Sequence, residues 1–158
     1  MATRDYTERA GEITPRPRTL PQFAATPALN PECFLQGRTT VAEYDGLPAG
    51  YVIVQPLDGL HYISSLVVAD GKSGLGIGKL LLDWAKRNAE AAGASGTCLT
   101  TFRTPRWNGP WYHREGYAEM PADQIGPGLQ AILARHATFL DMAARITMWK
   151  PRASTSAG

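Results

Sequence analysis

Four glycines lie close together in the stretch GKSGLGIG at residues 71–78, between an apolar run that ends at Val68 and a helical pattern that starts at Lys79. The first amides of a helix have no partner within the helix and lie at the positive end of its dipole, so a glycine-rich loop at this place binds anions. The amides of Ser73–Lys79 would be the donors, and the side chains of Lys72 and Lys79 would add positive charge. The sequence therefore predicts a site for a phosphate-bearing ligand.

Two nucleotide-binding motifs are excluded at this loop. A Walker A motif fails because Leu66 stands where its first glycine is required. The dinucleotide pattern G-x-G-x-x-G fails because Lys79 or Leu81 takes the place of its third glycine. A domain that binds ATP or NAD thus has no motif in its support, whereas an ordinary glycine-rich turn that starts a helix stays an alternative.

The loop resembles the acetyl-CoA-binding loop of the GNAT (Gcn5-related N-acetyltransferase) superfamily. That loop reads Gln/Arg-x-x-Gly-x-Gly/Ala at the start of a helix, and its two glycines fall on Gly76 and Gly78. Ser73 takes the place of the Gln/Arg, which is a departure from the pattern. Either the neighbouring Lys72 supplies the missing charge, or backbone amides alone hold the pyrophosphate.

A second block, WNGPWYHREGY at residues 107–117, is similar to the asparagine and the aromatic-Tyr-x-x-x-Gly-Phe/Tyr signature of the same superfamily. The strand Thr101–Arg103 before it matches a subgroup in which Thr-Phe-Arg precedes Trp-Asn-x-Pro-Phe-Tyr. The resemblance is close over residues 61–117, fair over 39–151 and absent over the first 36.

This resemblance implies an acetyl-CoA-dependent N-acetyltransferase in which an amine attacks the thioester directly in a ternary complex. Tyr112 would be the general acid toward the departing thiolate, because a phenol with a pKa of about 10 is protonated at neutral pH; a half-buried tyrosine without a catalytic role is the alternative. The central strand would end apart from its neighbour, so that its backbone binds the pantetheine arm. The cofactor-binding residues are expected to be Leu66, Val67, Val68, Lys72, Ser73, Gly74, Gly76, Gly78, Lys79 and Asn108.

The general base is left open by the sequence. Glu43, Asp58 and His61 lie on or near predicted strands, but each is more often a surface or turn residue, and ordered water could do the same work. Neither Cys33 nor Cys98 stands in a recognisable nucleophile setting. The spacing of the histidines and cysteines predicts no metal site.

The helices and strands that the sequence predicts around these residues indicate an α/β fold. We expect a mixed, mostly antiparallel sheet with a central β-loop-α-β acyl-CoA unit and helices on both faces. Strands are expected at Thr39–Tyr44, Gly50–Gln55, His61–Val68, Cys98–Phe102, Tyr117–Met120 and Arg145–Lys150, and helices at Lys79–Ala92, within Trp107–Glu115 and from Gly126 onward.

Composition and prolines predict the organisation of the chain. Its 158 residues suit one domain at 37–151. Closely spaced prolines predict that residues 1–36 form a mostly irregular arm, with at best a short helix near Tyr6–Ile13. The polar residues 152–158 are expected to form a disordered tail. Few cysteines and the lack of an apolar leader or spanning segment favour the cytoplasm.

The net charge of +2 favours neither nucleic acid nor a membrane as partner. A small-molecule or peptide amine is the expected acceptor, its identity left open, and a homodimer could cover the flank that the short N-terminus exposes. The alternative function is a catalytically silent GNAT-like sensor or interaction module that binds an acyl-CoA. Ser73 and the proline-rich arm favour that alternative.

Overall fold

The computed structural model describes residues 2–5, 38–44, 47–69, 71, 74–104 and 106–153. The chain divides into two compact units. Unit 1 comprises Met1–Gln55 and Ile63–Asn88, and unit 2 comprises Pro56–Tyr62 and Ala89–Gly158. Several residues named above lie outside the described ranges, namely Lys72, Ser73, Cys33, the predicted helix near Tyr6–Ile13 and the tail from residue 154.

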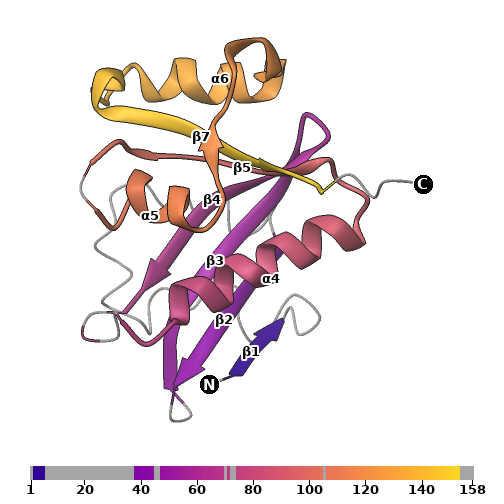
Figure 1. Ribbon diagram of the computed structural model, residues 1–158, viewed down its shortest axis with the longest axis vertical. Helices are drawn as coiled ribbons and strands as arrows, with labels where there is room; N and C mark the ends of the chain where they lie inside the picture. Colours follow the sequence, from indigo (N-terminus) through magenta and orange to yellow (C-terminus); the bar gives the residue numbers. More distant parts are fainter. Residues whose placement is uncertain are drawn as a thin grey trace. The chain divides into compact units, whose positions relative to one another are not determined.

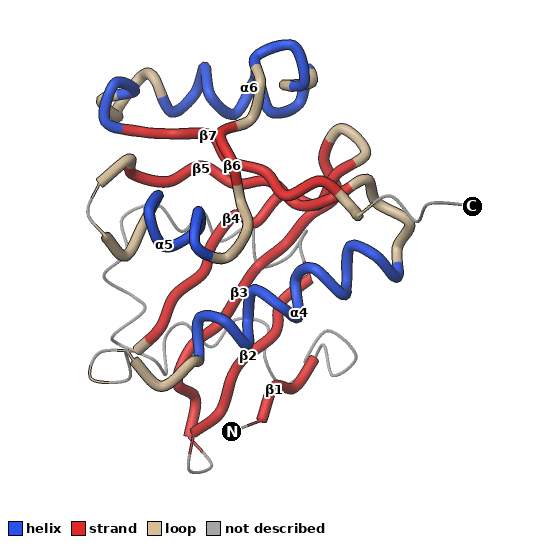
Figure 2. Tube along the Cα trace, in the orientation of Figure 1, coloured by secondary structure: helices blue, strands red, loops and turns tan. Residues whose placement is uncertain are grey.

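Unit 1 contains the strand order β1-β2-β3-β4 (Figure 2). Strand β2 pairs antiparallel with β1 on one side and with β3 on the other. The predicted hairpin is confirmed, with a register shift between Ala42 and Glu43. The last residues of β3 and α4 and the first residues of β4 belong to unit 2. The elements are β1 (Ala2–Asp5), β2 (Arg38–Tyr44), β3 (Leu47–Leu57), β4 (Leu60–Val68) and α4 (Ile77–Ala91).

Strand β1 was not predicted from the sequence, which indicated a mostly irregular segment over residues 1–36. Ala2–Asp5 pairs with β2 in a register that runs from Ala2–Glu43 to Asp5–Thr40. Because β1 is an edge strand, its backbone pairs with a partner on one side only. The sequence of Ala2–Asp5 has no apolar alternation by which a strand is recognised.

Helix α4 forms as its apolar periodicity predicts. Ile77, Leu81 and Ala85 are at most 1% exposed and lie on one stripe of the helix. Gly50 of β3 allows the close approach of this stripe, since a Cβ there would lie 3.2 Å from both Cγ2 of Ile77 and Cδ1 of Leu81. Figure 1 shows α4 running across β3 and β2. The exposed positions of the helix are mostly charged: Lys79, Asp83, Lys86, Arg87 and Glu90.

Unit 2 contains the strand order β4-β5-β7-β6. The pairing of β4 with β5 is parallel, whereas β5 with β7 and β6 with β7 are antiparallel. The sheet is therefore mixed and mostly antiparallel, as predicted. The elements are β5 (Gly96–Phe102), α5 (Gly109–Arg114), β6 (Ala118–Glu119), η3 (Ala122–Gln124), α6 (Pro127–His136), η4 (Met142–Ala144) and β7 (Arg145–Pro151).

Helices cover both faces of the sheet in unit 2, which confirms another prediction (Figure 1). Successive side chains of a strand point to opposite faces. On β5, Thr97 and Thr101 form hydrogen bonds with residues of the α5 segment, residues 108–117. Cys98 instead packs with Leu129 and Ile132 of α6. The α5 side and the α6 side of β5 are thus two separate environments.

The N-terminus of α6 is capped by a residue from the turn between β3 and β4. Oδ1 of Asp58 accepts from the amide of Gly128 at 2.9 Å, and its Oδ2 accepts from the amide of Leu129 at 2.9 Å. Both carboxylate oxygens therefore satisfy first-turn amides, which also places the negative charge at the favourable end of the helix dipole. Glycine suits position 128 because a Cβ there would lie 2.8 Å from Oδ1 of Asp58.

Candidate active site

The glycine loop of unit 1 has the backbone conformation that its sequence requires. Gly74 and Gly76 have φ values of 81° and 79°, in the left-handed region that side chains disfavour. A Cβ on either glycine would meet no atom within 4 Å, so these residues are glycine for their conformation and not for lack of space within the protein. The loop residues 74–76 are exposed.

The last residue of the loop, Gly76, forms the first hydrogen bond of α4. The amide of Leu80 donates to the carbonyl of Gly76 at 3.0 Å, which closes the first turn. The amides of Ile77, Gly78 and Lys79 precede that bond and have no partner within the helix. The first turn contains no acidic residue, and Lys79 is exposed. This geometry is suited to an anionic ligand.

The central strand β4 pairs with β5 in parallel where both lie in unit 2, through His61–Thr97 and Tyr62–Cys98. Leu66, Val67 and Val68, the backbone residues expected to bind a pantetheine arm, lie on β4 beyond these two pairs and are half-buried.

In unit 2, Asn108 is oriented by β5. Its Oδ1 accepts a hydrogen bond from Oγ1 of Thr101 at 3.0 Å, and its side chain makes no cap bond to α5. Since the side-chain oxygen is the acceptor toward Thr101, the amide nitrogen remains as a donor for a ligand. Gly109 allows the helix to start next to β5, because a Cβ there would lie 2.9 Å from the carbonyl oxygen of Arg103.

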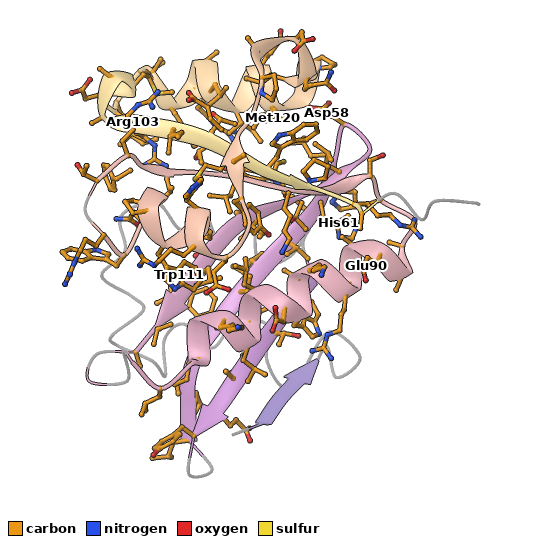
Figure 3. All side chains as sticks on the ribbon, in the orientation of Figure 1. Asp58, His61, Glu90, Arg103, Trp111 and Met120 are labelled. Carbon is orange, nitrogen blue, oxygen red and sulfur yellow. The ribbon has the colours of Figure 1, made fainter. Side chains whose placement is uncertain are left out.

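Tyr112 lies in an aromatic cluster on α5 and is 8% exposed. Its ring makes edge contacts with Trp111 at 4.8 Å and with Tyr117 at 5.7 Å between centroids. The hydroxyl of Tyr117 is 2.6 Å from Oγ1 of Thr97, which fixes the cluster to β5. Burial, followed by the nearby Tyr117, raises the pKa of Tyr112, so its phenol is protonated at neutral pH. Figure 3 shows Trp111 beside α5.

The three candidates for a general base differ in their surroundings. Asp58 is the cap of α6, so its carboxylate has a structural role. His61 lies on β4 in unit 2 and is 6% exposed. Glu43 lies on β2 in unit 1 and is half-buried. The structure therefore favours the turn-residue interpretation for Asp58.

Covalent and metal chemistry find little support among the described residues. Cys98 is fully buried, and burial together with the charge of Asp58 raises the pKa of its thiol to about 12, which keeps it protonated. Within the described ranges no three His, Cys, Asp or Glu side chains gather in a way that could hold a metal ion. No helix in the same part of the chain is both long and apolar enough to cross a membrane.

One feature of unit 2 was missed by the sequence analysis: Arg145, at the start of β7, bonds to Thr100 on β5. These residues are 45 positions apart, and a hydrogen bond over that separation has no local signal in the sequence.

Comparisons with known proteins place these features in context. The sequence model of a family described as "Acetyltransferase (GNAT) domain" matches residues 35–119. Rv2747 from Mycobacterium tuberculosis, solved with CoA and a further ligand, is 19% identical, with 97% of this chain and 100% of that chain covered and a TM-score of 0.67. The IAA acetyltransferase from Bacillus cereus is 20% identical, with 85% and 91% covered and a TM-score of 0.64.

A candidate streptothricin acetyltransferase from Bacillus anthracis, in complex with acetyl coenzyme A, is 18% identical, with 72% of this chain covered and a TM-score of 0.56. This chain covers only 61% of that protein's length. At these identities the likeness to the solved structures shows the fold alone.

Proposed function

Because the chain belongs to the GNAT acetyltransferase family, whose model matches more than half of its residues, we propose that it transfers an acetyl group from acetyl-CoA to an amine. The amine attacks the thioester directly, in a ternary complex, and no covalent intermediate forms on the protein. The observation that carries this proposal is the glycine loop that opens α4, with two glycines at positive φ and a first helical turn that contains no acidic residue. The pyrophosphate of a CoA ester is the anion that we assign to it.

Binding of the cofactor has two parts in this proposal. The amides of Gly74–Lys79, with the ammonium of Lys79, neutralise the pyrophosphate. The backbone of Leu66–Val68 and the side chain of Asn108 bind the pantetheine arm and align the thioester. The place of Leu66–Val68 at the end of β4 supports the first of these pantetheine contacts, and the Thr101–Asn108 hydrogen bond supports the second.

Tyr112 is the proposed general acid. The departing thiolate of CoA takes a proton from its hydroxyl while the new amide bond forms, and the attacking amine loses its own proton to a base or to water. The phenol of Tyr112 retains its proton at neutral pH, so it is available as a donor. Cys98 takes no part, since its thiol is buried and protonated.

The acceptor that we propose is the amine of a small molecule. The Bacillus anthracis relative is described as acting on streptothricin, a small-molecule acceptor, and this supports a small-molecule class here without selecting a particular compound.

The exchange Tyr112→Phe tests the mechanism. The rate of thiol release from acetyl-CoA with a panel of small amines should fall about 10- to 1000-fold in kcat, with KM for acetyl-CoA almost unchanged. Tyr117→Phe is the matched control, because it removes a neighbouring hydroxyl that bonds to Thr97. This exchange should lower the stability of the protein and leave kcat almost unchanged. An unchanged kcat in Tyr112→Phe would remove Tyr112 from the mechanism. Binding of CoA without thiol release for any amine would favour the silent acyl-CoA module.

A further inference from the structure

A cavity of about 550 Å³ lies within unit 2, between residues of β5 and β7 and the segment that contains η3 and α6. Small-molecule sites commonly occupy about 300–1000 Å³, so its size suits a small organic ligand. Its rim includes the exposed Arg103, Glu119 and Ala122, whereas Thr100 and Arg145 lie further in and are half-buried. Figure 3 shows Arg103 and Met120 on the side of α6.

Arg145 is the charged group of the cavity wall. One of its terminal nitrogens, Nη2, donates to Oγ1 of Thr100 at 3.0 Å, and its Cζ lies 4.9 Å from the ring centroid of Phe102. These two contacts hold the guanidinium in place. Its Nε is buried and has no hydrogen-bond partner in the structure. A guanidinium held in this way retains donors for a planar anion.

No carboxylate of the described residues neutralises Arg145. Glu119 at the cavity rim pairs instead with Arg103, with an Oε1–Nη2 distance of 3.3 Å. Burial lowers the pKa of the Arg145 guanidinium, an effect that Tyr62 partly opposes, and this is the direction expected for a partly desolvated cation.

Most of the remaining lining residues are apolar. Met120 is 4% exposed, and Ile125 and Leu133 are half-buried against the core cluster of unit 2. A ligand that fills this space would gain free energy by covering these side chains. The cavity therefore joins one unneutralised cation to an apolar wall.

We propose that this cavity is a binding site for a small organic carboxylate with an apolar body. The carboxylate accepts hydrogen bonds from Arg145, and the apolar body packs against Met120, Ile125 and Leu133. The site is distinct from the surroundings of Tyr112, because Thr100 lies on the α6 side of β5 whereas Thr101 bonds to Asn108 on the α5 side.

Heteronuclear NMR of the full-length, nitrogen-labelled protein tests the proposal with two carboxylates, phenylacetate and isovalerate, and with their neutral amides. The carboxylates should shift the resonances of Thr100, Thr147 and the Nε of Arg145. The amides should bind about tenfold or more weakly, because they lose a charge-assisted bidentate interaction. Equal binding of acid and amide, or the absence of shifts at the cavity with both acids, would overturn the proposal.

Two variants separate the charge from the space. Arg145→Gln should weaken phenylacetate binding about tenfold or more, whereas Arg152→Gln, which removes an exposed arginine outside the cavity lining, should leave it unchanged. Ala122→Trp keeps Arg145 but adds bulk at the exposed rim, and it should also weaken binding. Unchanged affinity in the folded Arg145→Gln protein, or in Ala122→Trp if Arg145→Gln does not fold, contradicts the assignment.

The carboxylate could belong to the acceptor or to a molecule that regulates the enzyme without reacting. An acetylation assay with phenylalanine, which has both a carboxylate and an amine, distinguishes these two sources. This assay rests on the proposed function. If it is acetylated and its KM rises about tenfold in Arg145→Gln, the site binds the acceptor. If phenylacetate binds but phenylalanine is not acetylated, the site binds a regulatory carboxylate. Both results support the site itself.

Discussion

The helices α4 and α6 both begin after glycine-containing turns, but the amides of their first turns meet different groups. At α6, the two oxygens of Asp58 accept from the amides of Gly128 and Leu129. At α4, the first turn contains no acid, and the described loop residues before it, Gly74–Gly76, have no polar side chain. A carboxylate of the chain therefore meets the dipole at α6, whereas the first turn of α4 and the described residues before it supply none.

This difference shows how a structural helix start is distinguished from a ligand-binding one. Glycines occur at both, so glycine content alone does not separate them. The separating feature is the source of the negative charge: a carboxylate of the chain at α6 and, in our proposal, the pyrophosphate of acetyl-CoA at α4.

Gly78→Asp should have the largest effect on acetyl-CoA binding, because it places a carboxylate at the first turn of α4, as Asp58 does at α6. The carboxylate would compete for the free amides and repel the pyrophosphate, and acetyl-CoA should bind about a hundredfold more weakly or worse. Calorimetric titration measures this. Gly78→Ala, which keeps the turn without the charge, should retain most of the affinity, and an equal loss in both variants would show that space and not charge decides.

Asp58→Ala should have the next largest effect, and it should act on stability. Removal of a cap that satisfies two amides should lower the free energy of unfolding by about 1–2 kcal/mol. Urea unfolding measures this loss. Asp58→Asn keeps one acceptor and should lose less. Asp123→Asn, at an exposed position of η3, is the control for a lost surface charge. A loss of acetyl-CoA affinity without a loss of stability would contradict the structural role of Asp58.

Lys79→Gln should have the smallest effect. Lys79 is exposed, so its ammonium is screened, and its removal should weaken acetyl-CoA binding only a few-fold, by about 0.3–1 kcal/mol. The difference from the wild type should shrink further as salt is added. A loss as large as that of Gly78→Asp would mean that side-chain charge, and not the backbone, holds the anion.

Local patterns predicted the elements that surround the site. The apolar stripe of α4, the strand β4 and the helix that begins near Pro110 follow from periodicity and turn residues, and the structure contains each of them. The aromatic block also placed Tyr112 on that short helix. These features are determined by neighbours within a few positions of the chain, which a single sequence displays directly.

Contacts between distant parts of the chain were not predictable in this way. Asp58 bonds to the amide of Gly128, 70 positions later, and Arg145 bonds to Thr100 across 45 positions. Strand β1 depends on pairing with β2, more than 30 residues away, and its own residues alternate no apolar face. In each case the partner is set by the tertiary fold, for which one sequence has no local signal.

Titration of the full-length protein with CoA, followed through backbone amide resonances, tests the central claim most directly. We predict that the largest changes occur at Gly74–Lys79, while the amides of Gly128 and Leu129, already bonded to Asp58, change little. No change on addition of CoA, or changes that spare Gly74–Lys79, would contradict the account.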